Sequence, residues 1–171
     1  WLMKGLLEFH EQVKDYFIAR DASMIFLFRR NLVRRMVSLL ANAYDKANRL
    51  LNGTHKSHVH SPDEAQVLAK FKPSINVTVL IKDLRTAERR VERALECFKT
   101  TRHMVFYYED LIKNRTKLVE LQRFLKLPVR NLTSLQVKIH DGPLSQQIEN
   151  WEEVQLTLRG TPYQKFIEDD Y

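Results

Sequence analysis

The sequence predicts a helix-rich α/β fold with short parallel strands at about residues 23–28 and 103–108. Met24 to Phe28 is a run of five consecutive apolar residues, which is typical of a strand buried on both faces of a parallel sheet. A second short apolar run starts at His103. Most of the remaining apolar residues recur at three and four positions, the spacing of half-buried helices.

Length and composition favour one globular domain over residues 1–171. The chain is 44% hydrophobic and 29% charged, and a chain of this length can bury roughly 70% of its unfolded surface. No apolar run approaches the ~18 residues that a membrane-spanning helix needs. The single cysteine, Cys97, excludes an internal disulfide and is expected to be a small buried hydrophobe.

The net charge of +7 favours encounters with anionic ligands. Nucleic acid is not the expected partner, because the charge is dispersed and no recognised nucleic-acid module is present. The arginines between positions 85 and 93 are interleaved with acidic residues, as on a solvated helix face.

The N-terminal half is expected to contain a helix, a strand and a second helix. An amphipathic helix is predicted over residues 3–20, and a longer one runs from Leu32 to about residue 51 after the first strand. Its predicted inner face consists of Leu32, Met36, Leu39, Leu40, Ala43 and Ala47. The residues predicted to lie opposite are Arg34, Arg35, Ser38, Asp45 and Arg49.

The remaining elements are predicted from loop and capping residues and from the spacing of apolar residues. Residues 52–60 form a loop, and Ser61-Pro62 resembles a helix start with Ser61 as the cap. Helices are predicted over residues 83–99 and 114–126, on either side of the second strand. After a coil around 128–142, a helix is expected to begin near Trp151, with Asn150 and Glu153 as a capping-box-like pair.

The chemistry-bearing residues gather where the first strand ends. Ligands collect at the carboxyl ends of strands in α/β sheets, and a helix N-terminus offers free N–H groups to an anion. Arg29-Arg30-Asn31, with Ser38 two turns later, is therefore a candidate phosphate clamp. The alternative is that Arg30 pairs with a carboxylate at the strand end.

This segment resembles the 3'-phosphate-binding motif of sulfotransferases that use 3'-phosphoadenosine 5'-phosphosulfate (PAPS). The matching residues are Arg30, Asn31 and Ser38, whereas Leu32 and Arg34 depart from the family's common Pro and Asp. The segment Tyr108-Glu109-Asp110-Leu111 resembles the family's next strand end. The resemblance implies that Tyr108 lies against the adenine; otherwise Tyr108 is a strand-end aromatic.

A third segment, residues 136–154, is similar to the C-terminal part of carbohydrate-type sulfotransferases. The resemblance implies that its basic loop closes over the 3'-phosphate, with Lys138 as the first candidate and His140 and Gly142 as weaker ones. Taken together, the segments resemble plant sulfotransferases related to nodulation protein H, over nearly the whole chain.

The resemblance implies a partial P-loop-type three-layer fold and a transfer of the sulfuryl group from PAPS to a hydroxyl acceptor, expected to be a carbohydrate. No phosphate-binding loop is present in the sequence, so we expect the C-terminal portion of a sulfotransferase domain, inactive by itself. The catalytic residues stay unassigned, and no metal is expected.

Four Asn-x-Thr sequons begin at positions 52, 76, 114 and 131. This number exceeds the chance expectation for such a length, and the triplet is the acceptor for N-glycosylation. Together with the resemblance, the sequons favour a glycoprotein of the Golgi lumen.

Several alternatives stay open. His55, His58 and His60 could form a metal cluster, a basic loop near the acceptor or a plain surface loop. His10 lies about twenty residues before Arg30, a distance reminiscent of a catalytic histidine in relatives. The chain could also be a non-catalytic relative that binds anions or sulfated glycans, or a nucleic-acid-binding fragment.

Overall fold

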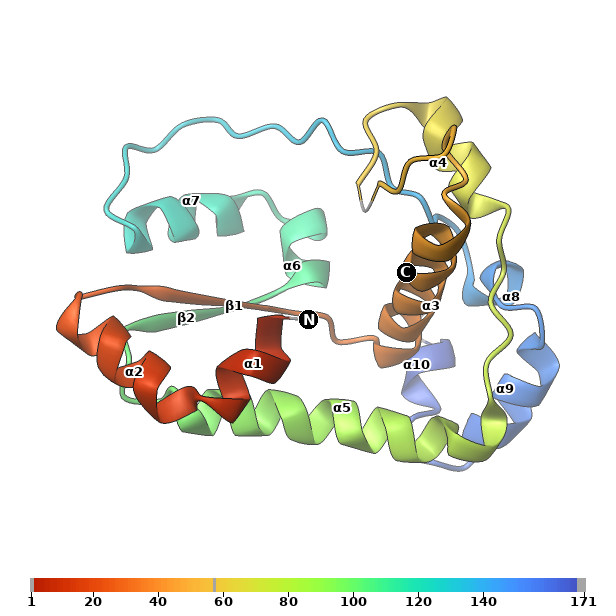
Figure 1. Ribbon diagram of the computed structural model, residues 1–171, viewed down its shortest axis with the longest axis horizontal. Helices are drawn as coiled ribbons and strands as arrows, with labels where there is room; N and C mark the ends of the chain where they lie inside the picture. The colour runs from red at the N-terminus through yellow and green to blue at the C-terminus, as the bar shows by residue number, and fades with distance from the viewer. Residues whose placement is uncertain (1, 57, 169–171) are drawn as a thin grey trace. The chain divides into compact units, whose positions relative to one another are not determined.

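The computed structural model describes residues 2–56 and 58–168 of the chain (Figure 1). The elements follow in the order α1 (Leu2–Glu8), α2 (His10–Ala19), β1 (Met24–Phe28), α3 (Leu32–Asn48), α4 (Pro62–Ala69), α5 (Val77–Cys97), β2 (His103–Tyr107), α6 (Tyr108–Lys113), α7 (Thr116–Phe124), α8 (Leu144–Gln147), α9 (Trp151–Leu158) and α10 (Lys165–Glu168).

The chain folds into two compact units. The first consists of Trp1–Arg30 and Arg85–Leu132, and the second of Asn31–Leu84 and Thr133–Tyr171. Helix α5 contributes to both units, since the boundary falls after Leu84.

The first unit contains the sheet. Strands β1 and β2 pair in parallel, from Met24 opposite His103 to Phe28 opposite Tyr107. The predicted helix-rich α/β fold with two short parallel strands is thereby confirmed, with strand ends within one residue of the prediction. The core of this unit consists of Leu7, Met24, Phe26, Phe28, Ala94 and Phe98.

Burial of β1 on both faces, however, was a wrong prediction. Met24, Phe26 and Phe28 are buried, whereas Ile25 is 41% and Leu27 58% exposed. Side chains from α1, α2 and the C-terminal turns of α5 pack against the Met24–Phe28 face alone. An apolar run by itself does not reveal how many of its faces are covered.

The predicted helix over residues 3–20 is divided at Phe9, which separates α1 from α2. Its φ of −111° and ψ of 35° lie outside helical values. Its side chain is exposed.

In the second unit, α3 begins at Leu32 as predicted. The side chain of Asn31 caps it: Oδ1 accepts the N–H of Arg34 at 3.0 Å, and Nδ2 donates to the Phe166 carbonyl at 2.7 Å. Asn31 thus ties the start of α3 to α10.

The predicted inner face of α3 was wrong except at Leu32, which is buried. Leu39 and Leu40 are exposed, whereas the charged Arg34 and Asp45 are only 2% and 3% exposed. Apolar spacing misplaces the buried face when charged residues lie inside with polar partners. The buried residues of α3 are Leu32, Val33, Arg34, Val37, Ala41 and Asp45.

The predicted starts of two helices are confirmed, but their predicted caps are not. Helix α4 begins after Ser61 and has Pro62 in its first turn, but the Ser61 side chain makes no capping hydrogen bond. Helix α9 begins at Trp151, and Asn150 Nδ2 reaches Glu153 Oε2 at 2.9 Å. Asn150 does not cap the helix; its amide instead pairs with the N–H and the carbonyl of Ile75, both at 2.8 Å.

None of the helices in the described part of the chain combines the length and the apolar character that a membrane crossing requires.

Candidate functional site

The carboxyl ends of β1 and β2 carry the candidate site of the first unit. Because the strands are parallel and in register, the residues that follow each strand leave the sheet at one edge. Together with Tyr107, the last residue of β2, they form what we call the strand-end cluster: Arg29, Arg30, Tyr107, Tyr108, Glu109 and Asp110.

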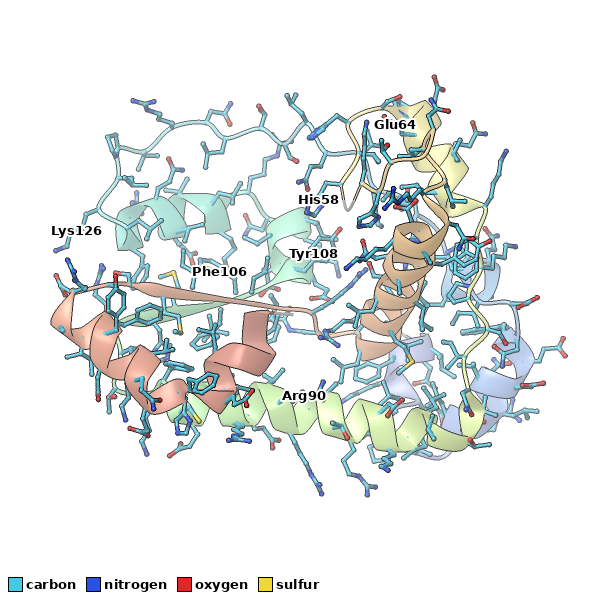
Figure 2. All side chains as sticks on the ribbon, in the orientation of Figure 1. His58, Glu64, Arg90, Phe106, Tyr108 and Lys126 are labelled. Carbon is cyan, nitrogen blue, oxygen red and sulfur yellow. The ribbon has the colours of Figure 1, made fainter. Side chains whose placement is uncertain are left out.

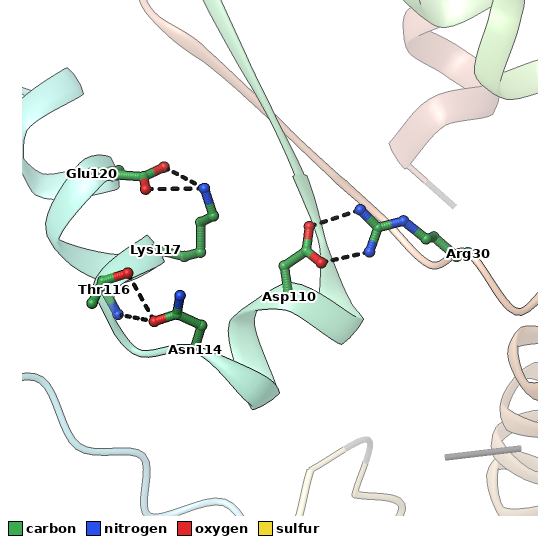
Figure 3. A network of polar contacts seen from close by, with 6 residues as sticks. All are labelled: Arg30, Asp110, Asn114, Thr116, Lys117 and Glu120. Carbon is green, nitrogen blue, oxygen red and sulfur yellow. Dashed lines mark hydrogen bonds and ion pairs between the residues drawn. The ribbon is translucent and has the colours of Figure 1, made fainter. Parts of the chain in front are cut away.

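Arg30 is held by acidic and aromatic groups. Its guanidinium donates to both carboxylate oxygens of Asp110, at 2.6 and 2.8 Å (Figure 3), and lies 4.0 Å from the centre of the Tyr107 ring. Its backbone N–H donates to the Glu109 carboxylate at 3.0 Å. The side chain is still 50% exposed, so the outer side of the guanidinium meets solvent.

Tyr108 has a second arginine as its partner. The Arg29 guanidinium lies 4.8 Å from the centre of the Tyr108 ring, within the range of a cation–π contact. Tyr108 follows β2 as the first residue of α6 and is half-buried (Figure 2). The cluster therefore presents two arginine–tyrosine pairs at one edge of the sheet.

The ion pair shifts both partners toward their charged forms. The hydrogen bond with Asp110 raises the pKa of Arg30, and the hydrogen bonds from Arg30 lower the pKa of Asp110. The lowered pKa means that the pair contributes fully to stability above the pKa of Asp110 in the unfolded chain, about 3.9 for an ordinary aspartate. The contribution is lost as the pH falls through the folded pKa.

We therefore expect the Asp110 carboxyl to titrate below its usual range in an NMR pH titration, since Arg30 stabilises its charged form. Arg30→Gln should raise the pKa of Asp110 most of the way back to its ordinary value. Arg20→Gln, a substitution in the same unit, should leave the pKa of Asp110 unchanged. A midpoint at the ordinary value in the native protein would show that the pair does not form in solution.

In the second unit, the loop that contains Lys138 is held to the first turn of α3. Lys138 Nζ pairs with Asp141 at 2.8 Å, and that hydrogen bond is the main reason why the pKa of Asp141 is lowered. Arg34 donates to the Gly142 carbonyl at 2.9 Å, and Gln147 donates to the same oxygen at 2.7 Å. Gly142 has a φ of +87°, which only glycine adopts without strain.

The four predicted site residues are divided between the units. Arg30 and Tyr108 lie at one sheet edge of the first unit. Ser38 is exposed on α3 of the second unit, which also contains Lys138. The unit boundary falls directly after Arg30, inside the motif that predicted the clamp.

The histidines that the sequence singled out have different surroundings. His55 Nδ1 bonds to the buried Asp45 carboxylate, His60 Nδ1 lies 3.1 Å from the Leu135 carbonyl, and His58 is exposed. Within residues 2–56 and 58–168, no three histidine, cysteine or acidic side chains gather as a metal site would require. His10 lies at the start of α2, beside Glu11 and the Leu7 carbonyl.

The structure shows the alternative that the sequence left open, in which Arg30 pairs with a carboxylate at the strand end; Asp110 is the partner. Sequence reasoning missed the part that Tyr107 and Arg34 play. Tyr107 could have been found by aligning the two strands in parallel register, which places it opposite Phe28, two residues before Arg30. No local pattern distinguishes the buried Arg34 from its neighbour Arg35. Cys97 is half-buried against the core of the first unit, less than was predicted.

No protein-family model, curated protein or solved structure matches this chain.

Proposed function

We propose that this chain is part of a PAPS-dependent sulfotransferase of the carbohydrate type, within a P-loop-type three-layer fold. The observation that carries the proposal is the strand-end cluster. Two parallel strands end side by side in Arg29-Arg30 and in Tyr108-Glu109-Asp110, in the order of the motifs that resemble this family.

The cluster contains two groups of the kind that bind an anionic purine nucleotide. Arg30 has a half-exposed guanidinium that can donate to phosphate oxygens. Tyr108 offers an aromatic ring next to the cationic Arg29, and flat aromatic groups stack on such a ring. We assign Arg30 to the 3'-phosphate and Tyr108 to the adenine.

Asp110 is the group that a phosphate must displace or share. It accepts two hydrogen bonds from Arg30, but the pair is exposed, and exposed ion pairs contribute little to stability. A phosphate carries more negative charge than the carboxylate and is a strong partner for arginine. Loss of the exposed Arg30–Asp110 pair by itself therefore costs the protein little.

Ser38 and Lys138 are further proposed contacts to the 3'-phosphate, on the resemblance alone. Within the second unit, Arg34 acts on the loop of Lys138 by holding the Gly142 carbonyl. Arg34 is thus a positioning residue for that loop.

The proposed reaction moves a sulfuryl group from PAPS to a hydroxyl acceptor, for which we propose a carbohydrate in the Golgi lumen. Such a transfer resembles phosphoryl transfer and requires positioned reactants and cationic groups that offset negative charge. The residues assigned above bind the nucleotide away from the reacting sulfur. The groups that contact the sulfuryl group and accept the hydroxyl proton are not assigned to this chain.

A thermal-shift comparison on the full-length protein tests the proposal. Adenosine 3',5'-bisphosphate (PAP) at about one hundred times its dissociation constant should stabilise the protein by about 2.7 kcal/mol and raise Tm by several degrees. AMP at the same concentration lacks the 3'-phosphate and should raise Tm far less. Equal shifts, or none, would contradict the assignment of Arg30. Binding of PAP without sulfuryl transfer would favour the non-catalytic alternative.

A further inference from the structure

Two of the four sequons share one local geometry. At Asn114, Oδ1 accepts the backbone N–H of Thr116 at 2.9 Å and its hydroxyl at 2.8 Å (Figure 3). At Asn76, Oδ1 accepts the same two donors of Thr78, at 3.0 and 2.7 Å. Both asparagines are exposed and stand just before helices, α7 and α5 respectively.

This geometry leaves the amide nitrogen outside the protein's own hydrogen bonds. The fold uses Oδ1 of Asn76 and Asn114, and within the described residues neither Nδ2 has a hydrogen-bond partner. Two asparagines outside the sequons, Asn48 and Asn150, differ in this respect. Nδ2 of Asn48 donates to the Tyr44 carbonyl at 2.9 Å, and Nδ2 of Asn150 donates to Ile75.

The nitrogen is the atom that N-glycosylation uses. Attachment of a glycan to an exposed Nδ2 that bonds to nothing else breaks no hydrogen bond of the fold. The threonine hydroxyl and amide meanwhile hold the asparagine by its oxygen. The two sequons thus combine an acceptor triplet with a native structure that tolerates the product.

We propose that Asn76 and Asn114 are N-glycosylated. In this reaction a bond forms between Nδ2 and C1 of the first sugar of a lipid-diphosphate-linked oligosaccharide. The bond between C1 and the diphosphate oxygen breaks, the lipid diphosphate leaves with the electron pair, and Nδ2 loses one proton to the transferase. No oxidant or reductant takes part.

The other two sequons lack the hydrogen bonds from threonine to the asparagine oxygen, although within the described residues Nδ2 of Asn52 and Asn131 also has no hydrogen-bond partner. Asn52 has a φ of +49°, and the hydroxyl of Thr54 donates to the Leu51 carbonyl instead. Asn131 lies in the exposed coil after α7, where no hydrogen bond joins it to Thr133 within the described residues. The proposal is therefore confined to Asn76 and Asn114.

Proline substitutions at the middle position of each sequon give a sharp test, because a sequon with proline there is no acceptor. Arg115 has a φ of −65°, and Asn114 before it is extended at φ −139° and ψ 104°, so both conformations accept Arg115→Pro. Val77 is the first residue of α5, where proline is favoured, so Val77→Pro is also tolerated. Arg115→Ala and Val77→Ala keep both sequons and serve as matched controls.

The full-length protein is produced in a eukaryotic host, and glycan sites are mapped by peptide-N-glycosidase digestion in ¹⁸O water. We expect conversion to aspartate at both positions 76 and 114. Each proline variant should lose one glycan, and the alanine controls should lose none. Absence of conversion at a position in the unsubstituted protein overturns the proposal there, whether or not the variants fold. Glycan mapping does not depend on PAP binding. Failure of this proposal can therefore be distinguished from failure of the proposed function in the thermal-shift test.

Discussion

Arg30→Ala should weaken binding of PAP to the full-length protein by about one to two powers of ten. Hydrogen bonds from a charged donor contribute roughly 1.5–3 kcal/mol, and each 1.4 kcal/mol is about tenfold in affinity. The half-exposed guanidinium supplies these bonds to the 3'-phosphate under the proposed function. Isothermal titration calorimetry with PAP measures the change, with AMP as the ligand that should be nearly insensitive to the substitution.

Because Arg30 forms an ion pair with Asp110, the variant Asp110→Asn distinguishes two possible roles of Arg30. Asp110→Asn keeps the guanidinium and removes the carboxylate that competes with phosphate for it. If Arg30 binds the 3'-phosphate, affinity for PAP should be retained or increased in Asp110→Asn. If Arg30 serves only to hold Asp110 in place, the two variants should weaken binding alike. Unchanged affinity in Arg30→Ala would remove the assignment altogether.

Arg34→Ala should lower the free energy of unfolding by about 2–4 kcal/mol. The substitution removes a long side chain that is 2% exposed, and the packing of its aliphatic stem is comparable to that of a buried leucine or methionine, whose truncation to alanine costs about 2–5 kcal/mol. It also removes the hydrogen bond from the guanidinium to the Gly142 carbonyl. Since Gln147 still donates to that oxygen, the carbonyl keeps one partner.

Urea denaturation gives this free energy by linear extrapolation. Arg35→Ala changes the adjacent, less buried arginine and should cost less than half as much. Arg34→Met keeps most of the buried volume, so the difference between the methionine and alanine variants separates packing from hydrogen bonding. Hydrogen exchange at residues 138–142 should be faster in both Arg34 variants. A loss below about 1 kcal/mol in Arg34→Ala, the size of an ordinary surface change, would contradict the buried role.

Local sequence patterns determined several of the elements, although not the division of α1 from α2 or helix α6. The five-residue apolar run of β1, the helix start at Leu32 with Asn31 before it, and the helix start at Trp151 are all encoded by residues a few positions apart. Apolar spacing and turn chemistry report the conformation of the chain near each residue, so these features could be predicted. Arg30 and Tyr108 were placed at strand ends for the same reason.

Tertiary structure decided which partner each polar side chain has. Arg30 pairs with Asp110 across 80 positions, and Asn150 bonds to Ile75 across 75. On the buried face of α3, Arg34 donates to the Gly142 carbonyl 108 positions away, whereas the partners of Asp45 lie within eleven positions, in the segment that follows the helix. Charged residues look alike along the sequence whether they are solvated or buried. The difference arises only when distant segments supply the hydrogen bonds that replace water.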